Sequence, residues 1–261
     1  LWSFVMLALL TGWLGRWPEL RREVRKPKLL ALLALTSLLI AANWLTFIYS
    51  VLTRQLLQSS LGYFANPLVS VLLGVVFLRE RLRPWQLVSI ALATSGVVVL
   101  AAMVGQVPWI ALTLAFTFAF YGLLRKIIPV DGMASLAVET CVLAPFALAY
   151  LGYLAGTEQV TGQGWPAIGR LMLSGPVTTI PLLFFGAAAR RLRLSTLGIL
   201  QYVTPSGQFL LAVLAFGEPF STPQLVSFAC IWTAIAIYTA DSYRAVRRRR
   251  VELIEPFGAD D

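Results

Sequence analysis

The chain has 261 residues, of which 58% are hydrophobic and 13% charged, and it carries a formal net charge of +9. Globular domains carry about 25% charged residues, so this composition argues against a water-soluble domain and indicates a membrane protein. With no histidine and two cysteines, the chain lacks the residues for a histidine-based or cysteine-rich metal site, and we expect no cofactor.

Nine apolar segments follow one another along the chain, close to the length of about 20 residues that crosses a bilayer. They are residues 1–15, 29–50, 60–78, 85–104, 108–124, 133–154, 170–189, 195–216 and 223–242. The first is short and begins at Leu1 without an initiator methionine, so we expect the chain to be truncated there. The sequence therefore predicts an all-α polytopic membrane protein with nine transmembrane helices.

The basic residues gather in alternate loops between these segments. All of them except Arg54 and Arg170 follow the first, third, fifth, seventh or ninth segment. Such asymmetry is the positive-inside pattern, and it predicts a cytoplasmic carboxyl terminus. We expect the basic loops and the tail, residues 244–261, to lie at anionic lipid headgroups, and we expect no nucleic-acid partner.

An internal repeat relates residues 60–89 to residues 198–227 at a constant shift of 138 positions. Pro67 aligns with Pro205, Glu80 with Glu218, and the sequence QLVS recurs. Five predicted spans separate the copies, so they cross the membrane in opposite senses. The sequence predicts an inverted repeat of residues 1–105 and 106–243, derived from a ten-helix (5+5) parent whose first helix is absent here.

Polar residues recur at helical spacing within the apolar segments. The stripes are Ser59, Tyr63, Asn66, Ser70 and Gly74; Gln201, Thr204, Gln208 and Ala212; Thr36, Asn43, Phe47 and Ser50; and Thr113, Thr117, Tyr121 and Arg125. Hydrogen bonds between helices would explain any single polar residue in a membrane. Matching stripes in two inverted halves favour a central cavity, where transporters bind their substrates.

From these stripes we predict a solute-binding site. Its core is Tyr63, Asn66, Gln201 and Gln208, and around it lie Asn43, Trp44, Tyr121 and Tyr202. Pro67 and Pro205 are predicted to break their helices and free carbonyl groups near Tyr63 and Gln201, although a packing kink is also compatible with the pattern.

Glu139 is the carboxylate that lies clearly within a predicted span. A carboxylate in hydrocarbon is costly, which makes it a functional hypothesis by default. We interpret it as a proton-coupling residue, and the alternative is a membrane-entry residue paired with Arg125 or Lys126. Glu80 and Glu218, at the ends of spans, are predicted to cap helices or to contact loops.

Several motifs together resemble those of a known transporter family. They are SLGYFANPL followed by RERL, FAFYGLLRK, ETCVLAP, GPVTTIPLLFFGAAARRLRLSTLG, and QYVTP followed by FGEP. In this order they resemble the RarD-type permeases of the EamA-like drug/metabolite transporter superfamily over essentially the whole chain. The resemblance implies ten helices in two inverted repeats, the bacterial inner membrane, and passage of small organic solutes without ATP.

Two features depart from the family pattern. The first helix and the start of the second are not present. In addition, the family has an Asn pair after its third helix and an acidic residue before ASLGYF, whereas this chain has Leu52-Thr53 and Gln58 in that region. No external-gate role is therefore assigned to that region.

We interpret the chain as a secondary transporter that works by alternating access. The alternatives are a polytopic membrane enzyme acting on a lipid-linked substrate, and a passive channel. An enzyme is disfavoured because no predicted span carries a carboxylate pair, a Ser/His arrangement or a metal motif. The sequence does not indicate the solute, its direction or its coupling, and a homodimer is left open.

Overall fold

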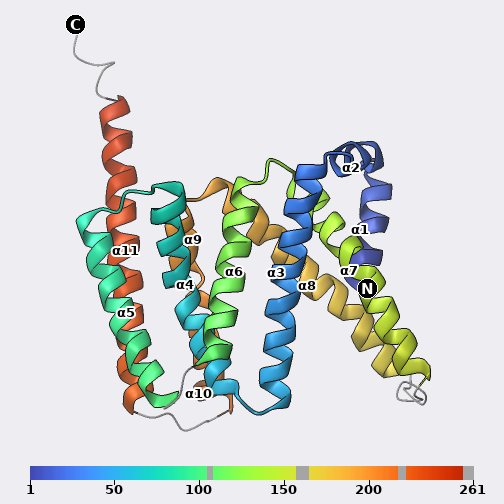
Figure 1. Cartoon of the computed structure of the whole chain (residues 1–261). Coiled ribbons are helices and arrows are strands. Elements are labelled where there is room, and N and C mark those ends of the chain that lie inside the picture. The colour runs from blue at the N-terminus through green and yellow to red at the C-terminus, as the bar shows by residue number, and fades with distance from the viewer. Residues whose placement is uncertain (105–107, 157–164, 217–221, 255–261) are drawn as a thin grey trace, which may run out of the picture. The chain divides into compact units, whose positions relative to one another are not determined.

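The computed structural model describes residues 1–104, 108–156, 165–216 and 222–254, and among these residues it contains helices and turns but no strand (Figure 1). In chain order the helices are α1 (Trp2–Trp13), α2 (Trp17–Val24), α3 (Pro27–Leu52), α4 (Leu56–Leu78), α5 (Pro84–Val104), α6 (Trp109–Ile127), α7 (Gly132–Gly156), α8 (Trp165–Arg191), α9 (Leu194–Leu200), α10 (Val203–Phe216) and α11 (Thr222–Ile254). Seven of the described helices, α3 to α8 and α11, are long and apolar enough to cross a membrane. The predicted all-α polytopic membrane protein is confirmed.

The number of nine spans is not confirmed, because two of the predicted segments take another form. Residues 1–15 contain α1, an apolar helix of 12 residues. At 1.5 Å per residue it is shorter than the roughly 30 Å of a hydrocarbon layer. Residues 195–216 are divided into α9 and α10, with a turn at Gln201 and Tyr202.

Pro205 is the third residue of α10 and lies close to the division between α9 and α10. A proline has no amide hydrogen, so residue 205 cannot donate to the carbonyl of Gln201 four residues earlier. That carbonyl accepts instead from the Thr204 amide at 3.2 Å, and the Tyr202 amide donates to the Ile199 carbonyl at 3.2 Å. Both are the tighter three-residue bonds that commonly end a helix. By contrast, α4 continues through Pro67, so the predicted helix break there is not found.

The helices pack into two compact units. The first unit contains Leu1–Leu45 and Phe120–Leu192, and the second contains Thr46–Ala119 and Arg193–Asp261. The chain passes from one unit to the other three times, within α3, within α6, and between α8 and α9. Each unit therefore contains helices from both predicted repeats, and the repeat boundaries at 1–105 and 106–243 stay predictions.

In the first unit, α1 packs against α7 and α8, and α7 also packs against α8 and α2. Leu7 and Leu136 belong to one buried cluster, and Leu33, Ile128 and Val138 belong to a second. These apolar contacts bring one face of α7 against α3, where the carboxylate described below lies.

In the second unit, α5 and α11 lie side by side (Figure 1). Ser89 Oγ donates to the Ala234 carbonyl at 2.6 Å, and a Cβ added at Gly96 would lie 2.9 Å from the Ser227 carbonyl. Small residues allow helix backbones in a membrane to approach this closely. The helix α4 packs against α5, α9 and α10, which places the predicted polar stripes of α4 and of Gln201 in one unit.

The short helix α9 begins at a carboxylate from a distant part of the chain. Glu80, in the loop between α4 and α5, accepts from the amides of Leu194 at 2.6 Å and Ser195 at 3.0 Å. The Ser195 hydroxyl also donates to Glu80 at 2.6 Å. The first amides of a helix have no partner within it, so Glu80 caps α9 as predicted. Glu218 lies outside the described residues.

Candidate functional site

Glu139 of α7 is 1% exposed and is surrounded by polar groups from α3 and α6. The Thr36 hydroxyl donates to Oε1 of Glu139 at 2.8 Å, and the Tyr121 hydroxyl donates to Oε2 at 3.3 Å. Nη1 of Arg125 lies 3.5 Å from Oε1. The carboxylate is both hydrogen-bonded and ion-paired, as a buried charge requires. We call Thr36, Tyr121, Arg125 and Glu139 the carboxylate cluster.

Arg125 is held from several directions within the first unit. Its side chain is 2% exposed, and Nη2 donates to the Gly132 carbonyl at 3.3 Å. The guanidinium carbon lies 5.7 Å from the centre of the Tyr121 ring, within range of a cation–π interaction. A Cβ added at Gly186 of α8 would overlap this guanidinium, so glycine at position 186 leaves the space that Arg125 occupies. The guanidinium therefore has a fixed position opposite Glu139.

A cavity of about 260 Å³ adjoins the carboxylate cluster on the α1, α3, α7 and α8 helices. Its lining is mostly apolar, and its polar groups include Ser3, Glu139, Thr140 and Thr178. Trp44, one of the predicted site residues, also lines it. The arrangement of an apolar wall with a few polar groups is typical of small-molecule sites.

In the second unit, Asn66 of α4 and Gln201 at the end of α9 are in direct contact. Nδ2 of Asn66 donates to Oε1 of Gln201. Asn66 is 5% exposed, and within the described part of the chain its Oδ1 has no hydrogen-bond partner. We call Asn66 and Gln201 the amide pair.

The close approach of α9 to α4 supports the amide pair, and the second unit also contains two of the predicted aromatic residues. A Cβ added at Gly198 of α9 would lie 2.8 Å from the Pro67 carbonyl, so only glycine lets α9 approach α4 this closely. The Tyr63 ring lies 5.9 Å from the Phe47 ring at 64°, an edge-to-face arrangement. Tyr202 is completely buried, and its hydroxyl has no partner among the described residues.

The predicted site residues thus fall into two groups, one in each unit. Asn43, Trp44, Tyr121 and Glu139 belong to the first unit, and Tyr63, Asn66, Pro67, Gln201, Tyr202 and Pro205 to the second. Asn43 is buried. Gln208 lies on α10, and its side chain is outside the described part of the structure.

Comparison with known proteins identifies the family. The model of the EamA-like transporter family matches residues 1–102. An "Uncharacterized transporter" of Vibrio cholerae is 46% identical over 94% of this chain and 82% of its own length. "Protein RarD" of Escherichia coli is 44% identical over 95% of this chain and 84% of its own. The chain belongs to the EamA-like transporter family and is of the RarD type.

A further relative and a solved structure agree with this family. "Protein RarD" of Streptomyces exfoliatus is 44% identical over 97% of this chain and 81% of its own length. A solved crystal structure aligns with 94% of this chain and 96% of its own at a TM-score of 0.52. At 18% identity that match shows the fold alone.

Sequence reasoning missed some residues that hold the sites of this RarD-type protein. Phe185 stacks on Tyr121 at 6.1 Å between ring centres and 15° between ring planes. Gly186, next to it, makes room for Arg125. A glycine beside an aromatic pair in an apolar helix gives no distinctive sequence signal, because most such glycines serve general helix packing.

Asp131 is a further missed residue, and it lies outside the candidate spans, directly before α7. It accepts from the Met133 amide at 3.1 Å and pairs with Arg16 at 3.2 Å and Arg190 at 3.3 Å. Burial alone raises the pKa of Asp131, but the Met133 amide, Arg190 and Arg16 together outweigh it and hold that pKa below its ordinary value. An aspartate before a helix is a recognisable N-cap signal that could have been read from the sequence.

Proposed function

We propose that this RarD-type protein is a secondary transporter that moves a small organic solute across the bacterial cytoplasmic membrane by alternating access, without ATP. The observation that carries the proposal is the carboxylate cluster, an ion pair enclosed among apolar helices and next to a cavity. A structural salt bridge in a membrane is costly and easily replaced by apolar packing, which favours a functional reason for it. The names of the relatives, transporters among them, give independent support.

In this proposal Glu139 couples transport to protons. When Glu139 is ionised, it holds Arg125, Thr36 and Tyr121 and so ties α3 and α6 to α7. Protonation removes the charge attraction to Arg125 and turns one carboxylate oxygen into a donor. The cluster then favours a different arrangement of its helices, so that proton binding shifts the balance between two conformations.

The solute is proposed to bind through the amide groups and aromatic rings predicted from the sequence. Asn66, Gln201 and Gln208 would orient its polar groups, and Tyr63 with Tyr202 would contact its apolar body. Asn43, Trp44 and Tyr121 complete the proposed set. Oδ1 of Asn66 has no partner in the part of the chain that the structure describes. This supports the role, because a buried acceptor without a donor costs free energy that a solute could recover.

The orientation of the chain is proposed from the charge pattern of its loops. The positive-inside rule places the basic loops and the carboxyl terminus in the cytoplasm. Labelling of single cysteines introduced at positions 54 and 83 would test it. Impermeant reagent added to intact cells should modify position 54 and spare position 83.

The function is tested by reconstitution of the purified protein. A thermal-shift screen of metabolites and drugs first identifies a ligand, because a solute that binds the folded protein raises its unfolding midpoint. That ligand, radiolabelled, is then followed in proteoliposomes. Saturable uptake with counterflow supports a carrier. Non-saturating conductance would instead indicate a channel, and chemical conversion of the ligand would indicate an enzyme.

Proton coupling is tested with Glu139→Gln, which removes the charge but keeps the size of the side chain. We expect counterflow of the solute to persist while the response to an imposed pH gradient is lost. Glu19→Gln, an exposed carboxylate on α2, is the matched control and should behave like the unmodified protein. Transport by Glu139→Gln that still follows the pH gradient would contradict the role of Glu139.

A further inference from the structure

The helix α2 is short, and half of its residues are charged. It has eight residues, WPELRREV, and so measures about 12 Å, too short to cross a bilayer. It follows α1 directly and precedes α3, a candidate membrane span that begins at Pro27. A short charged helix joined to a span belongs at the boundary between water and lipid.

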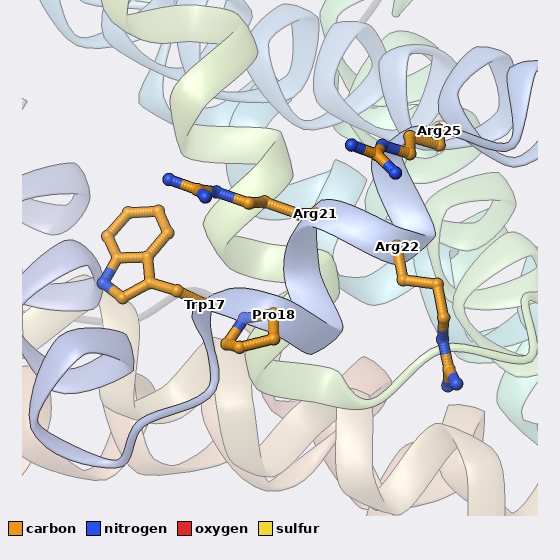
Figure 2. Close-up of a pocket in the computed structure, with 5 residues that line it drawn as sticks. All are labelled: Trp17, Pro18, Arg21, Arg22 and Arg25. Carbon is orange, nitrogen blue, oxygen red and sulfur yellow. The ribbon is translucent and has the colours of Figure 1, made fainter.

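An aromatic ring and two guanidinium groups lie together on α2 and the turn directly after it. Trp17 and Arg21 are four residues apart, which aligns them on one side of α2, and Arg25 lies another four residues on, in the turn directly after the helix. Figure 2 shows these three side chains extending to the same side, while Arg22 extends away from them. A hollow of about 520 Å³ is lined by these residues together with Pro18.

Several basic side chains of the described residues have an anionic or carbonyl partner. The pairs are Arg16 and Arg190 with Asp131, Arg83 with Asp241, Arg125 with Glu139, Arg193 with Glu80, and Lys126 with the carbonyls of Ala189 and Leu192. Among the described residues, neither Arg21 nor Arg25 forms an ion pair. Within the described part of the chain, their charges are therefore available to a partner from outside.

Trp17 is held in place although it is 42% exposed. Its Nε1 lies 3.2 Å from where a Cβ at Gly12 would be, so the indole rests on the end of α1 where glycine leaves room. Tryptophan is enriched at the depth of lipid headgroups, where its ring contacts apolar chains and its N–H contacts polar groups.

We propose that the surface formed by Trp17 and Arg21 of α2, together with Arg25 directly after it, is a binding site for the headgroup of an anionic phospholipid. The guanidinium groups would bind the phosphate through paired hydrogen bonds. The acyl chains would lie along α3, where Leu32, Leu35 and Leu38 are exposed. A free phosphate would use the guanidinium groups but would leave Trp17 and this leucine face without a role, which is why a lipid is the occupant.

The site is tested by titrating the purified protein in detergent with short-chain phosphatidylglycerol and following its unfolding midpoint. We expect a saturable rise, absent with phosphatidylcholine of the same chain length and with glycerol 3-phosphate. Arg21→Gln/Arg25→Gln should weaken the apparent affinity for phosphatidylglycerol by about tenfold or more, because each basic residue near an anionic surface contributes attraction. The apparent affinity of Arg21→Lys should fall between those of the parent and of the double variant, since lysine keeps the charge but cannot form the paired hydrogen bonds of arginine.

The matched control is Arg170→Gln, which removes one charge from an exposed position on α8. It should be compared with Arg21→Gln, and only the change on α2 should weaken lipid binding. Equal weakening by both would mean diffuse attraction to the net charge and would overturn the site. Equal stabilisation by phosphatidylcholine, or competition by glycerol 3-phosphate, would overturn the lipid as its occupant. Both variants should unfold at the same midpoint as the parent without lipid, and none of these readouts depends on transport.

Discussion

The carboxylate cluster and the amide pair are both buried polar groups among apolar helices, yet they differ in how completely their polar atoms are paired. Glu139 has three partners, and Arg125 is fixed by Glu139, Gly132 and the space at Gly186. Asn66 is bonded to Gln201 but has an acceptor that no described residue satisfies. Within the described residues, the charged group is fully paired, whereas the neutral amide keeps one acceptor without a hydrogen-bond partner.

This difference indicates what each group can do. A charge that is completely paired contributes little to binding a solute, but changing its protonation state alters every contact around it. An amide with a vacant acceptor has the opposite properties, since it can bind a donor without breaking existing contacts. We therefore assign coupling to the carboxylate cluster and recognition to the amide pair, and the predictions below test that division.

The largest effect is expected from Arg125→Ala. It leaves the Glu139 carboxylate buried without its counter-charge, and removal of one partner of a buried pair costs about 3–5 kcal/mol. The unfolding midpoint in detergent should fall sharply. Arg125→Met/Glu139→Leu should recover much of the loss, because apolar packing can replace both partners. A double variant as unstable as Arg125→Ala would show that the pair itself is not the cause.

A smaller loss is expected from Gly186→Ala, because the new methyl group overlaps the Arg125 guanidinium. Overpacking of this kind costs about 1–3 kcal/mol when the neighbour cannot move away. Gly152→Ala on α7 is the matched control. It also replaces a helical glycine by alanine, but the added Cβ meets nothing within 4 Å. If both substitutions shift the midpoint equally, Arg125 is less fixed than its contacts indicate.

The amide pair should behave in the opposite way. Asn66→Ala removes a neutral hydrogen bond and should cost about 1 kcal/mol in stability. It should nevertheless abolish solute uptake in proteoliposomes, because recognition is lost. Ser95→Ala, whose hydroxyl bonds within its own helix, is the control. Unchanged uptake by a stable Asn66→Ala protein would remove the amide pair from the proposed site.

The smallest effect is expected from Asp131→Asn, because the carboxylate is partly exposed and solvent screens its ion pairs. The folded-state pKa of Asp131 is lowered, so its contribution is complete above its unfolded value of about 4 and is lost as the pH falls through the folded pKa. Unfolding midpoints of the parent and of Asp131→Asn should therefore differ at neutral pH and converge in acid. A difference that grows in acid would contradict this sign.

The sequence predicts the helical membrane fold, the capping role of Glu80 and the polar stripes, because each rests on local pattern or composition. Thr36, Tyr121 and Arg125 lie in the predicted stripes, and the structure brings them to Glu139. The stripes could be read because polar residues in hydrocarbon are rare and keep the helical period.

Other features depend on contacts that no local pattern encodes. Pro67 and Pro205 look alike in sequence, yet α4 continues through the first and the chain turns before the second. Phe185 and Gly186 matter only because α8 brings them to α6. The partition of the candidate residues between two packing units likewise depends on tertiary contacts and not on the repeat period.

The seven-residue helix α9 is held at both of its ends, at the first by the α4–α5 loop and at the last by α4. Glu80 holds its first amides, and Gln201 at its last turn is bonded to Asn66. A helix this short has almost no stability of its own, so it has to follow α4 as a rigid attachment. The loop after Glu80 reaches α11 through the ion pair of Arg83 with Asp241 at 2.5 Å. These contacts form a continuous path from Asn66 through α9 and the α4–α5 loop to α11.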